Sequence, residues 1–424
     1  MSNPILSVIK NRNFRNLWLA QITSQIAINM MAFVLAIFVY DKTKSNTAVS
    51  VMMLSIGLPA IFFGVIAGGI VDRFNKKYVL VLCNIFRAFA MIFFFFSSES
   101  IVFVYILAAL ISIITQFFVP AEAPSIPNLV SQDELLPANS LFTFSYYLST
   151  ISGFILSGPA IKLFGSHNIF LFMSLLLFVA SFFAWKIPKD KGVKKGNFES
   201  VGHIWSDIKE GLLFIKNNIK VKEGIYLLTF SQALIGTLAA LSPGFSDKVL
   251  KIDLTDASYL VMGPAAMGLI IGALWIGSFG RNYLKRRLIV NGIIMTGLAI
   301  LLMSLIVRVR SHPEITLFIK GAEVIIGNLY VAIITLAVIG FSNSLINIPS
   351  NTVLQEDTEG KLRGRVYGVL TALTGGAAIL PTVFAGGMAD TFGVGKTLFF
   401  IGILILLIGI WQVLKQGKLL VKIK

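Results

Sequence analysis

Charged residues are scarce in this sequence of 424 residues, and those present are mostly basic. Lys and Arg number 36 against 20 Asp and Glu, and together they make up only 13% of the chain. Soluble proteins carry about a quarter charged residues. With 56% hydrophobic residues and a mean hydropathy of +0.83, the composition excludes an ordinary soluble domain. It predicts an integral membrane protein.

Cysteine and histidine are also nearly absent, which limits the possible chemistry. The single cysteine, Cys83, lies inside an apolar segment, so an internal disulfide and a cysteine-rich metal site are excluded. The three histidines, His167, His203 and His312, are scattered over predicted loops and do not suggest zinc. No group of catalytic residues falls within the apolar segments. We therefore expect no metal, no cofactor and no enzymatic activity.

Two signals for nucleotide or nucleic-acid binding are weak. The stretch "GVGKT", Gly393–Thr397, is similar to part of a phosphate loop, but Asp390 stands where that loop needs its first glycine. The net charge of +16 is divided among short segments between apolar runs, which is typical of cytoplasmic loops. A nucleic-acid partner is therefore not expected, and the lipid bilayer is the expected surrounding.

Long apolar runs dominate the sequence, and each is close to the 20 or so residues that cross a bilayer. We predict twelve membrane-spanning helices in an all-α protein. They cover approximately 16–40, 47–71, 78–97, 101–121, 141–163, 168–187, 224–246, 258–279, 288–307, 326–347, 366–389 and 397–414. The start near 326 is ambiguous, because "EITLFIKGAEVIIG" before it fits either an outer loop or part of a span.

Basic residues determine the expected orientation. With both termini in the cytoplasm, 26 of the 36 Lys and Arg fall in inner segments. This bias follows the positive-inside rule. The longest polar stretch lies in the middle and gives three expected parts: a bundle of six helices over 1–187, a cytoplasmic loop over 188–223 and a second six-helix bundle over 224–424.

The two halves resemble each other weakly. Each has a proline, two glycines four residues apart and then a basic turn: Gly64 and Gly68 in the first half, Gly268 and Gly272 in the second. Such glycines also occur simply because they let helices pack closely. Two related bundles with a site between them are the arrangement expected of a secondary transporter.

The stretch "GGIVDRFNKK" resembles the loop motif between the second and third helices of the major facilitator superfamily. The stretches "NFRNLWLAQITSQIA", "FFVPAEAPSIPNLV", "LPANSL", "SGPAI" and "LRGRVYG" are similar to the macrolide-efflux type of drug:proton antiporter. The resemblance covers essentially the whole chain. It implies a secondary transporter with two pseudo-symmetric bundles. Asn75 replaces the usual glycine of the loop motif, and asparagine also tolerates a positive φ.

The resemblance implies a cytoplasmic latch at the loop motif. Asp72, braced by Arg73, would hold the start of the eleventh helix, whose N-terminus carries a partial positive charge. The residues involved are Gly68, Asp72, Arg73, Lys76, Lys77, Arg363 and Arg365. An ordinary alternative exists for Lys76 and Lys77, which also serve as positive-inside charges.

Three charged residues are candidates for proton coupling. Arg87 lies about ten residues into the third span, where an arginine costs roughly 2.5–3.5 kcal/mol on insertion scales. Glu122 follows Pro120 near the inner end of the fourth span, and its counterpart in the repeat is Asn347. An acid in partly dehydrated surroundings can exchange protons near neutrality. Asp41 is the second choice, and for both acids a plain interfacial charge is the alternative.

Polar side chains at helical spacing mark the expected cavity. In the first half they are Gln21, Ser24, Gln25 and Asn29, and in the second half they are Thr229 and Gln232. Facing lipid would leave them without partners, so they either line a cavity or pack on a neighbouring helix. Gly158 and Pro159 in the fifth span resemble an antiporter signature, for which an ordinary proline kink is the alternative.

These features predict a proton-driven exporter of hydrophobic or amphipathic small molecules by alternating access, expected as a monomer in a bacterial inner or plasma membrane. A carrier of lysophospholipids, siderophores or other secondary metabolites with the same fold is the alternative. A non-transporting receptor or a membrane enzyme fits less well, because the spans contain no catalytic cluster.

Overall fold

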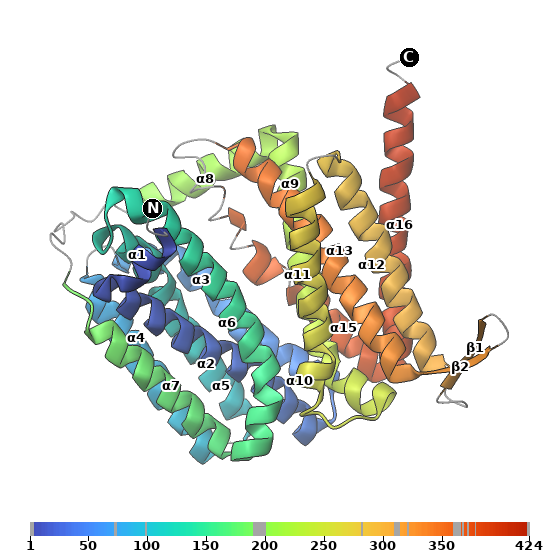
Figure 1. Ribbon diagram of the computed structural model, residues 1–424, viewed down its shortest axis with the longest axis horizontal. Coiled ribbons are helices and arrows are strands. Elements are labelled where there is room, and N and C mark those ends of the chain that lie inside the picture. The colour runs from blue at the N-terminus through green and yellow to red at the C-terminus, as the bar shows by residue number, and fades with distance from the viewer. Residues whose placement is uncertain are drawn as a thin grey trace. The chain divides into compact units, whose positions relative to one another are not determined.

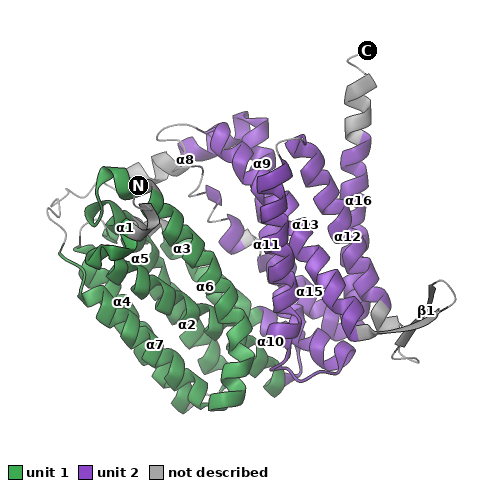
Figure 2. Cartoon of the chain, viewed as in Figure 1, with its two compact units in different colours: residues 1–42, 51–206 green, residues 43–50, 207–424 purple. Residues whose placement is uncertain are grey.

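The computed structural model is built almost entirely of long helices (Figure 1). It describes residues 4–71, 74–97, 100–189, 201–280, 283–308, 314–319, 322–358, 366, 369–370, 373–377 and 379–421. By contacts the chain divides into two compact units, coloured separately in Figure 2. Unit 1 is Met1–Lys42 with Val51–Ser206, and unit 2 is Thr43–Ser50 with Asp207–Lys424.

Unit 1 contains the helices of the first half of the chain. They are α1 (Pro4–Lys10), α2 (Arg12–Thr43), most of α3 (Asn46–Val71), α4 (Lys76–Ser97), α5 (Ile101–Glu122), α6 (Leu135–Phe164) and α7 (Asn168–Trp185). Short 3₁₀ turns at Ala123–Asn128 and Gln132–Glu134 connect α5 to α6. Helix α4 packs between α5 and α7. A core around Phe14, Leu80 and Phe118 closes one end of the unit.

Unit 2 contains the helices of the second half. They are α8 (Val201–Asn217), which begins in unit 1, α9 (Ile219–Phe245), α10 (Ala257–Leu260), α11 (Met262–Phe279), α12 (Lys285–Arg308), α13 (Asn328–Glu356), α15 (Ile379–Phe392) and α16 (Val394–Val421). Five-residue π-helical turns occupy Ser246–Leu250 and Leu373–Ala377. Helix α13 packs against α9, α11 and α12, and α9 also packs against α15.

One segment differs from an all-helical chain. Glu314–Ile319 and Ala322–Gly327 form the antiparallel strands β1 and β2, and α13 begins directly after them at Asn328. Isoleucine, valine and threonine, which favour strands, are frequent in both segments. The ambiguous stretch before the tenth predicted span is therefore a hairpin and not part of a membrane helix.

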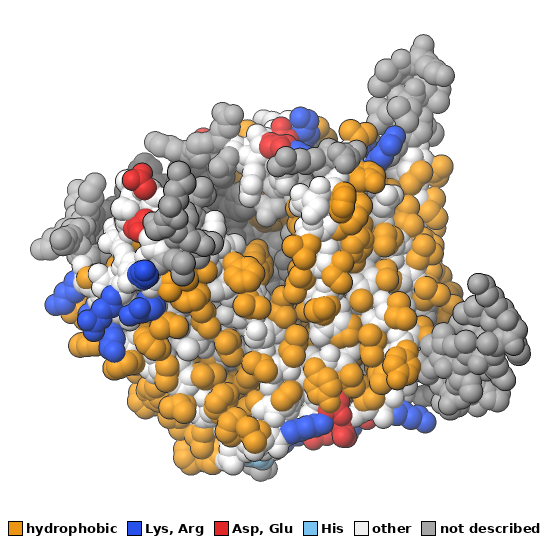
Figure 3. Space-filling view, in the orientation of Figure 1, with side chains coloured by type: hydrophobic (Ala, Val, Ile, Leu, Met, Phe, Trp, Pro, Cys, Tyr) orange, Lys and Arg blue, Asp and Glu red, His pale blue; other side chains and the backbone are white. Residues whose placement is uncertain are grey.

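The expected spans correspond to long apolar helices. Among the described residues, eleven helices are long and apolar enough to cross a membrane. The predicted span 366–389 falls partly outside the described residues, and its described part is α15 with the preceding turn. Large apolar side chains also lie on the outside: Phe96 and Phe384 are each 73% exposed. Hydrophobic side chains cover much of the visible face in Figure 3, as a lipid-facing surface requires.

Two helices of unit 2 approach each other so closely that glycine is required. A Cβ atom on Gly268 of α11 would lie 2.7 Å from the carbonyl carbon of Ala337 in α13, and one on Gly340 of α13 would lie 2.8 Å from that of Ala265. The glycine spacing of the second half thus marks a real helix crossing. Gly64 in the first half is different, because its Cβ would meet only the side-chain oxygen of Gln116, at 3.5 Å.

This contrast predicts different effects for the same substitution at the two glycines. Gly268→Ala forces backbone apart and should destabilise the protein by about 1–3 kcal/mol, as overpacking generally does. Gly64→Ala should be neutral or slightly stabilising, because alanine favours the helix and the space is open. Thermal unfolding of the purified variants in one detergent measures both. Equal melting temperatures for the two variants would contradict the close crossing.

Candidate functional site

The predicted cytoplasmic latch falls mostly outside the described residues. Asp72, Arg73, Arg363 and Arg365 lie there, while Gly68 is part of helix α3. Lys76 and Lys77 begin helix α4, and the Lys77 ammonium lies 5.0 Å from the centre of the Trp185 ring. A cation over an aromatic face is a stabilising contact in its own right.

Arg87 is the largest fully buried side chain of the described residues, at 1% exposure in the middle of α4. Its Nη1 donates to Ser24 Oγ at 3.2 Å and to Asn84 Oδ1 at 3.4 Å. The guanidinium carbon lies 4.3 Å from the centre of the Phe118 ring. These contacts bring α2, α4 and α5 together around one cation.

Two of the three nitrogens of the Arg87 guanidinium have no hydrogen-bond partner among the described residues. Its Nε and Nη2 atoms are buried without an acceptor among the described residues. Burying a charge without full pairing costs free energy, so a partly paired cation in a helical bundle is unusual.

Glu122 is the other buried charged side chain of the described residues, although no ion pair joins it to Arg87 among the described contacts. It is the last residue of α5, only 6% exposed, and its Oε1 is buried without a donor from the part of the chain that the structure describes. Arg87 and Glu122 interact electrostatically. Pro120 within the helix and the 3₁₀ turn that starts at Ala123 position the carboxyl group at this helix end. Unit 1 therefore contains a buried acid and a buried base, each incompletely paired.

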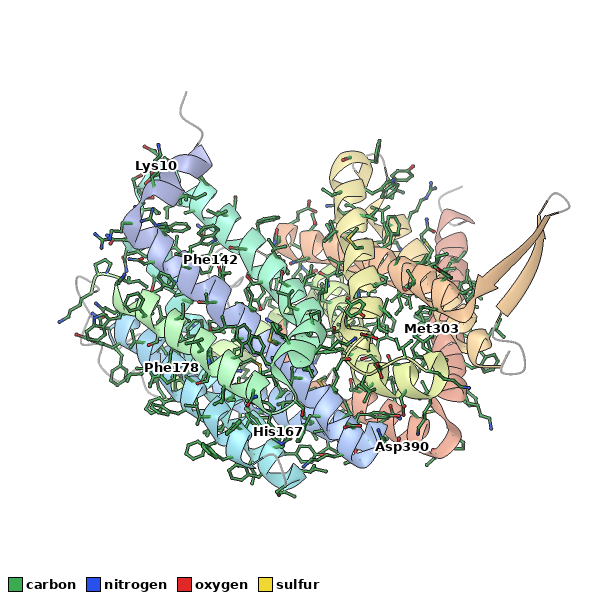
Figure 4. All side chains as sticks on the ribbon, turned by 60° about the horizontal axis from the view of Figure 1, so that its bottom comes forward. Lys10, Phe142, His167, Phe178, Met303 and Asp390 are labelled. Atoms are coloured by element: carbon green, nitrogen blue, oxygen red, sulfur yellow. The ribbon has the colours of Figure 1, made fainter. Side chains whose placement is uncertain are left out.

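The polar face of α2 meets neighbouring helices of unit 1. Ser24 Oγ donates to Asn84 Oδ1 at 3.2 Å, and Gln21 Nε2 donates to the carbonyl oxygen of Phe142 in α6 at 3.2 Å. Phe142 is labelled in Figure 4. Asn29 Nδ2 donates to the Gln25 carbonyl oxygen one turn earlier, at 2.8 Å. Gln21 and Ser24 are buried, whereas Gln25 and Asn29 are half-buried.

Sequence reasoning missed three partners of this face. Asn84 precedes Arg87 by three residues and therefore lies on the same face of α4. Ser145 of α6 accepts from Trp18 Nε1 at 2.7 Å and donates to Gln21 Oε1 at 3.3 Å. The spacing of Asn84 was a usable signal, but nothing in the sequence indicated that Ser145 and Trp18 would meet.

The buried polar side chains that the structure describes in unit 2 are all neutral. Ser231 of α9 is buried and accepts from Asn343 Nδ2 at 2.8 Å and from Asn347 Nδ2 at 3.2 Å, both on α13. Thr229, two residues earlier, has a buried Oγ1 without a partner among the described residues. Gln232, predicted beside it, is exposed.

The remaining candidates lie apart from these clusters. Asp41 is exposed near the end of α2. In α6, Gly158 is buried and Pro159 is exposed. The close approach of α6 to α2 falls at another glycine: a Cβ on Gly153 would lie 2.9 Å from Asn29 Cβ. Among the residues that the structure describes, no three His, Cys, Asp or Glu side chains gather as metal ligands would.

Comparison with known proteins identifies the family of the chain. The profile of the Major Facilitator Superfamily matches residues 17–382. The MFS-type transporter YfiS of Bacillus subtilis (strain 168) is 26% identical over 89% of this chain and 86% of its own length. Macrolide efflux protein A of Streptococcus pyogenes is 23% identical over 94% of each chain.

A more distant relative and a solved structure extend the comparison. The enterobactin exporter EntS of Shigella dysenteriae serotype 1 is 22% identical, covering 95% of this chain and 93% of EntS. The crystal structure of the nucleoside transporter NupG matches with a TM-score of 0.73 at 12% identity, covering 94% of this chain and 98% of NupG. At that identity the structural match establishes the fold alone. The chain belongs to the Major Facilitator Superfamily and is a multi-pass membrane transporter of small molecules, not an enzyme.

Proposed function

We propose that this transporter exports hydrophobic or amphipathic small molecules in exchange for protons, by alternating access. The observation that carries the proposal is the incompletely paired Arg87 and Glu122 inside unit 1. The similarity to macrolide efflux protein A supports export of a drug-like compound. Glu122 is the proposed proton carrier, and Asp41 remains the second candidate.

The proposed exchange follows from the surroundings of Glu122. A buried carboxylate oxygen without a donor, such as Glu122 Oε1 among the described residues, makes the ionised form costly, and protonation lowers that cost. A cationic or polar substrate group near the carboxylate would lower it equally well. Substrate and proton therefore compete for the same carboxyl group, so binding of the substrate favours release of the proton and protonation favours release of the substrate. Arg87 also favours exchange over joint binding. If a proton and a cationic substrate group were both bound near Glu122, the interior would hold more positive charge beside Arg87, which is electrostatically unfavourable.

The polar interiors supply the proposed substrate contacts. In unit 1 the candidates are Gln21, Ser24, Gln25 and Asn29, and in unit 2 they are Thr229 and, at an exposed position of α9, Gln232. Gln25 and Asn29 are only half-buried, and Thr229 has an unpartnered hydroxyl. These groups suit a compound that is mostly apolar with a few hydrogen-bonding atoms.

A siderophore or another secondary metabolite is the second candidate cargo. The observation that favours it is the similarity to the enterobactin exporter EntS, which extends over nearly the whole of both chains. Such a compound also has many hydrogen-bonding atoms on an apolar frame. Lysophospholipids are the third cargo class to be tested.

Transport in proteoliposomes with an inside pH indicator tests the proposal. Macrolides, hydrophobic cationic dyes, catecholate siderophores and lysophospholipids are added one at a time. We expect at least one of the first two classes to drive proton movement that depends on the protein. Proton-free uptake of lysophospholipid alone would replace the exporter hypothesis with a lipid carrier.

The variant Glu122→Gln should lose coupled proton movement while it still binds substrate, because the amide keeps the shape but cannot ionise. We expect proton flux to fall at least tenfold. Binding is followed by substrate-induced changes in tryptophan fluorescence. Asp133→Asn, which alters an exposed acid in the turn before α6, is the matched control. Full uphill transport by Glu122→Gln would remove Glu122 from the proton role.

We also propose that both termini and the loop between the units face the cytoplasm, in accordance with the distribution of basic residues. Single cysteines in a Cys83→Ala background test this. His167→Cys, in the exposed turn between α6 and α7, should react with a membrane-impermeant maleimide on intact cells. Lys10→Cys, exposed at the end of α1, should react only after the cells are permeabilised. The reverse pattern would invert the topology.

A further inference from the structure

Helix α3 starts with two caps: Ser45, just before the helix, accepts the Ala48 N–H at 3.1 Å, and a second capping group comes from another helix far along the chain. The carboxylate of Asp390, near the C-terminal end of α15, accepts the backbone N–H of Asn46 at 2.8 Å and that of Thr47 at 2.9 Å. It also accepts from Asn46 Nδ2 at 3.0 Å and from the hydroxyl of Ser45. Asp390 is labelled in Figure 4.

This contact answers a definite need of the helix. The first N–H groups of a helix have no partner within it, and the helix end carries a partial positive charge. A capping side chain normally comes from the residue just before the helix. Ser45 has that role for the Ala48 N–H, and the N–H groups of Asn46 and Thr47 are capped by an acid 344 residues from Asn46 in sequence. Burial alone would raise the pKa of Asp390, but the hydrogen bonds from Ser45, Thr47 and Asn46 outweigh it and hold that pKa well below its ordinary value. Asp390, just past the predicted span 366–389, is therefore ionised at neutral pH.

The same face of α15 continues the contact one and two turns deeper. Ser50 Oγ donates to the carbonyl oxygen of Thr382 at 3.0 Å. Between them, a Cβ on Gly386 would lie 2.8 Å from the Asn46 carbonyl oxygen and 3.0 Å from Ser50 Cβ. Thr382, Gly386 and Asp390 are spaced four apart, so they form one helix face. That face matches Asn46 and Ser50, which are both 0% exposed.

Helix α9 forms the other side of the site that holds the Asn46 side chain. A Cβ on Gly244 would lie 2.9 Å from both Cγ and Nδ2 of Asn46, so only glycine leaves room for this side chain. The first five residues of α3 are accordingly counted with unit 2, while Val51–Val71 of the same helix belong to unit 1. One continuous helix thus begins in one unit and ends in the other.

We propose that Asp390 is a detachable cap that holds the start of α3 on α9 and α15, and that its release is the step that opens the transporter on this side. The contact has the properties of a latch. Its outermost part consists of hydrogen bonds at the aqueous end of a helix, where water can replace each of them. The residues beneath the cap are small, so the start of α3 can pack closely against α15 and can separate from it without large side chains moving. The name "α3 latch" denotes Asn46, Ser50, Thr382, Gly386 and Asp390.

The opening role rests on the proposed transport by alternating access, but the latch itself is measurable without any substrate. Ser50→Cys in the Cys83→Ala background places a thiol beneath the cap, where Ser50 is 0% exposed. The rate of labelling by a membrane-impermeant maleimide then reports how often the latch opens. The rates are compared among Asp390, Asp390→Ala, Asp390→Asn and the control Asp253→Asn, an exposed acid of unit 2.

We expect Asp390→Ala to raise the labelling rate about tenfold, the size of effect that loss of a helix cap produces. Asp390→Asn, which keeps one acceptor oxygen but no charge, should give a smaller rise, and Asp253→Asn none. Hydrogen exchange of the Asn46–Val51 amides in the protein without the engineered cysteine should rise in the same order. Unchanged labelling and exchange in Asp390→Ala would overturn the latch.

A gel-filtration profile and melting curve for each variant separate opening from misfolding. If Asp390→Ala unfolds, Asp390→Asn carries the test, and labelling equal to that of Asp253→Asn then refutes the proposal. If the latch responds as expected but the parent protein moves no compound and no protons, the transport function fails and the latch stands as a property of the fold. Faster labelling with unchanged exchange would also count against the cap.

Discussion

The whole structure depends on one constraint: a polar group inside an apolar bundle must find its partner within the bundle, on its own helix or on a neighbouring one. Water is absent there, and backbone groups are already used within each helix. Arg87 shows the consequence most clearly, since its contacts to Ser24, Asn84 and Phe118 fix the positions of α2, α4 and α5 around a single side chain. Replacing such a cation by an apolar residue would remove an organising centre as well as a charge.

The two units satisfy this constraint with different chemistry. Unit 1 has an acid and a base in its interior, whereas the cluster at Ser231 in unit 2 consists of hydroxyl and amide groups only. The repeat comparison aligns Glu122 with Asn347, so corresponding positions hold an ionisable group in one half and a neutral group in the other. A neutral cluster stays the same when the pH changes. The proposed proton exchange would therefore act through unit 1, and the cluster at Ser231 would contribute a fixed set of hydrogen-bonding groups.

The sequence predicted the elements far better than their partners. Helix positions follow from apolar length, and the burial of Arg87 follows from its place inside a long apolar run. The burial of Glu122 did not follow in this way, because Glu122 lies just past the predicted span 101–121, where an interfacial charge was the alternative. The hairpin at Glu314–Gly327 was ambiguous because its composition fits a strand or a span equally well. Gly64 and Gly268 have the same pattern, yet only Gly268 lies at a close crossing, because spacing reports a helix face and not the distance to its neighbour.

The contact between Asp390 and the start of α3 could not be predicted from the sequence for a related reason. Helical periodicity relates residues within one helix and gives no information about a contact between two helices far apart in the chain. Its position nevertheless follows from the energetics of opening. Breaking a hydrogen bond in the middle of a bundle leaves both groups in hydrocarbon, at a cost of several kcal/mol for each group. Breaking one at the aqueous end exchanges it for water at a net cost of about 1 kcal/mol. A transporter that must open and close repeatedly therefore needs its releasable contacts at helix ends. An ionisable group that exchanges protons should instead be buried, because burial makes the free energy of the site depend on whether the group is charged. Both carboxyl groups lie at or near a helix end, but Glu122 is only 6% exposed, whereas Asp390 takes part in exposed hydrogen bonds from Ser45 and Thr47. This difference suits the two groups to the different steps proposed for them.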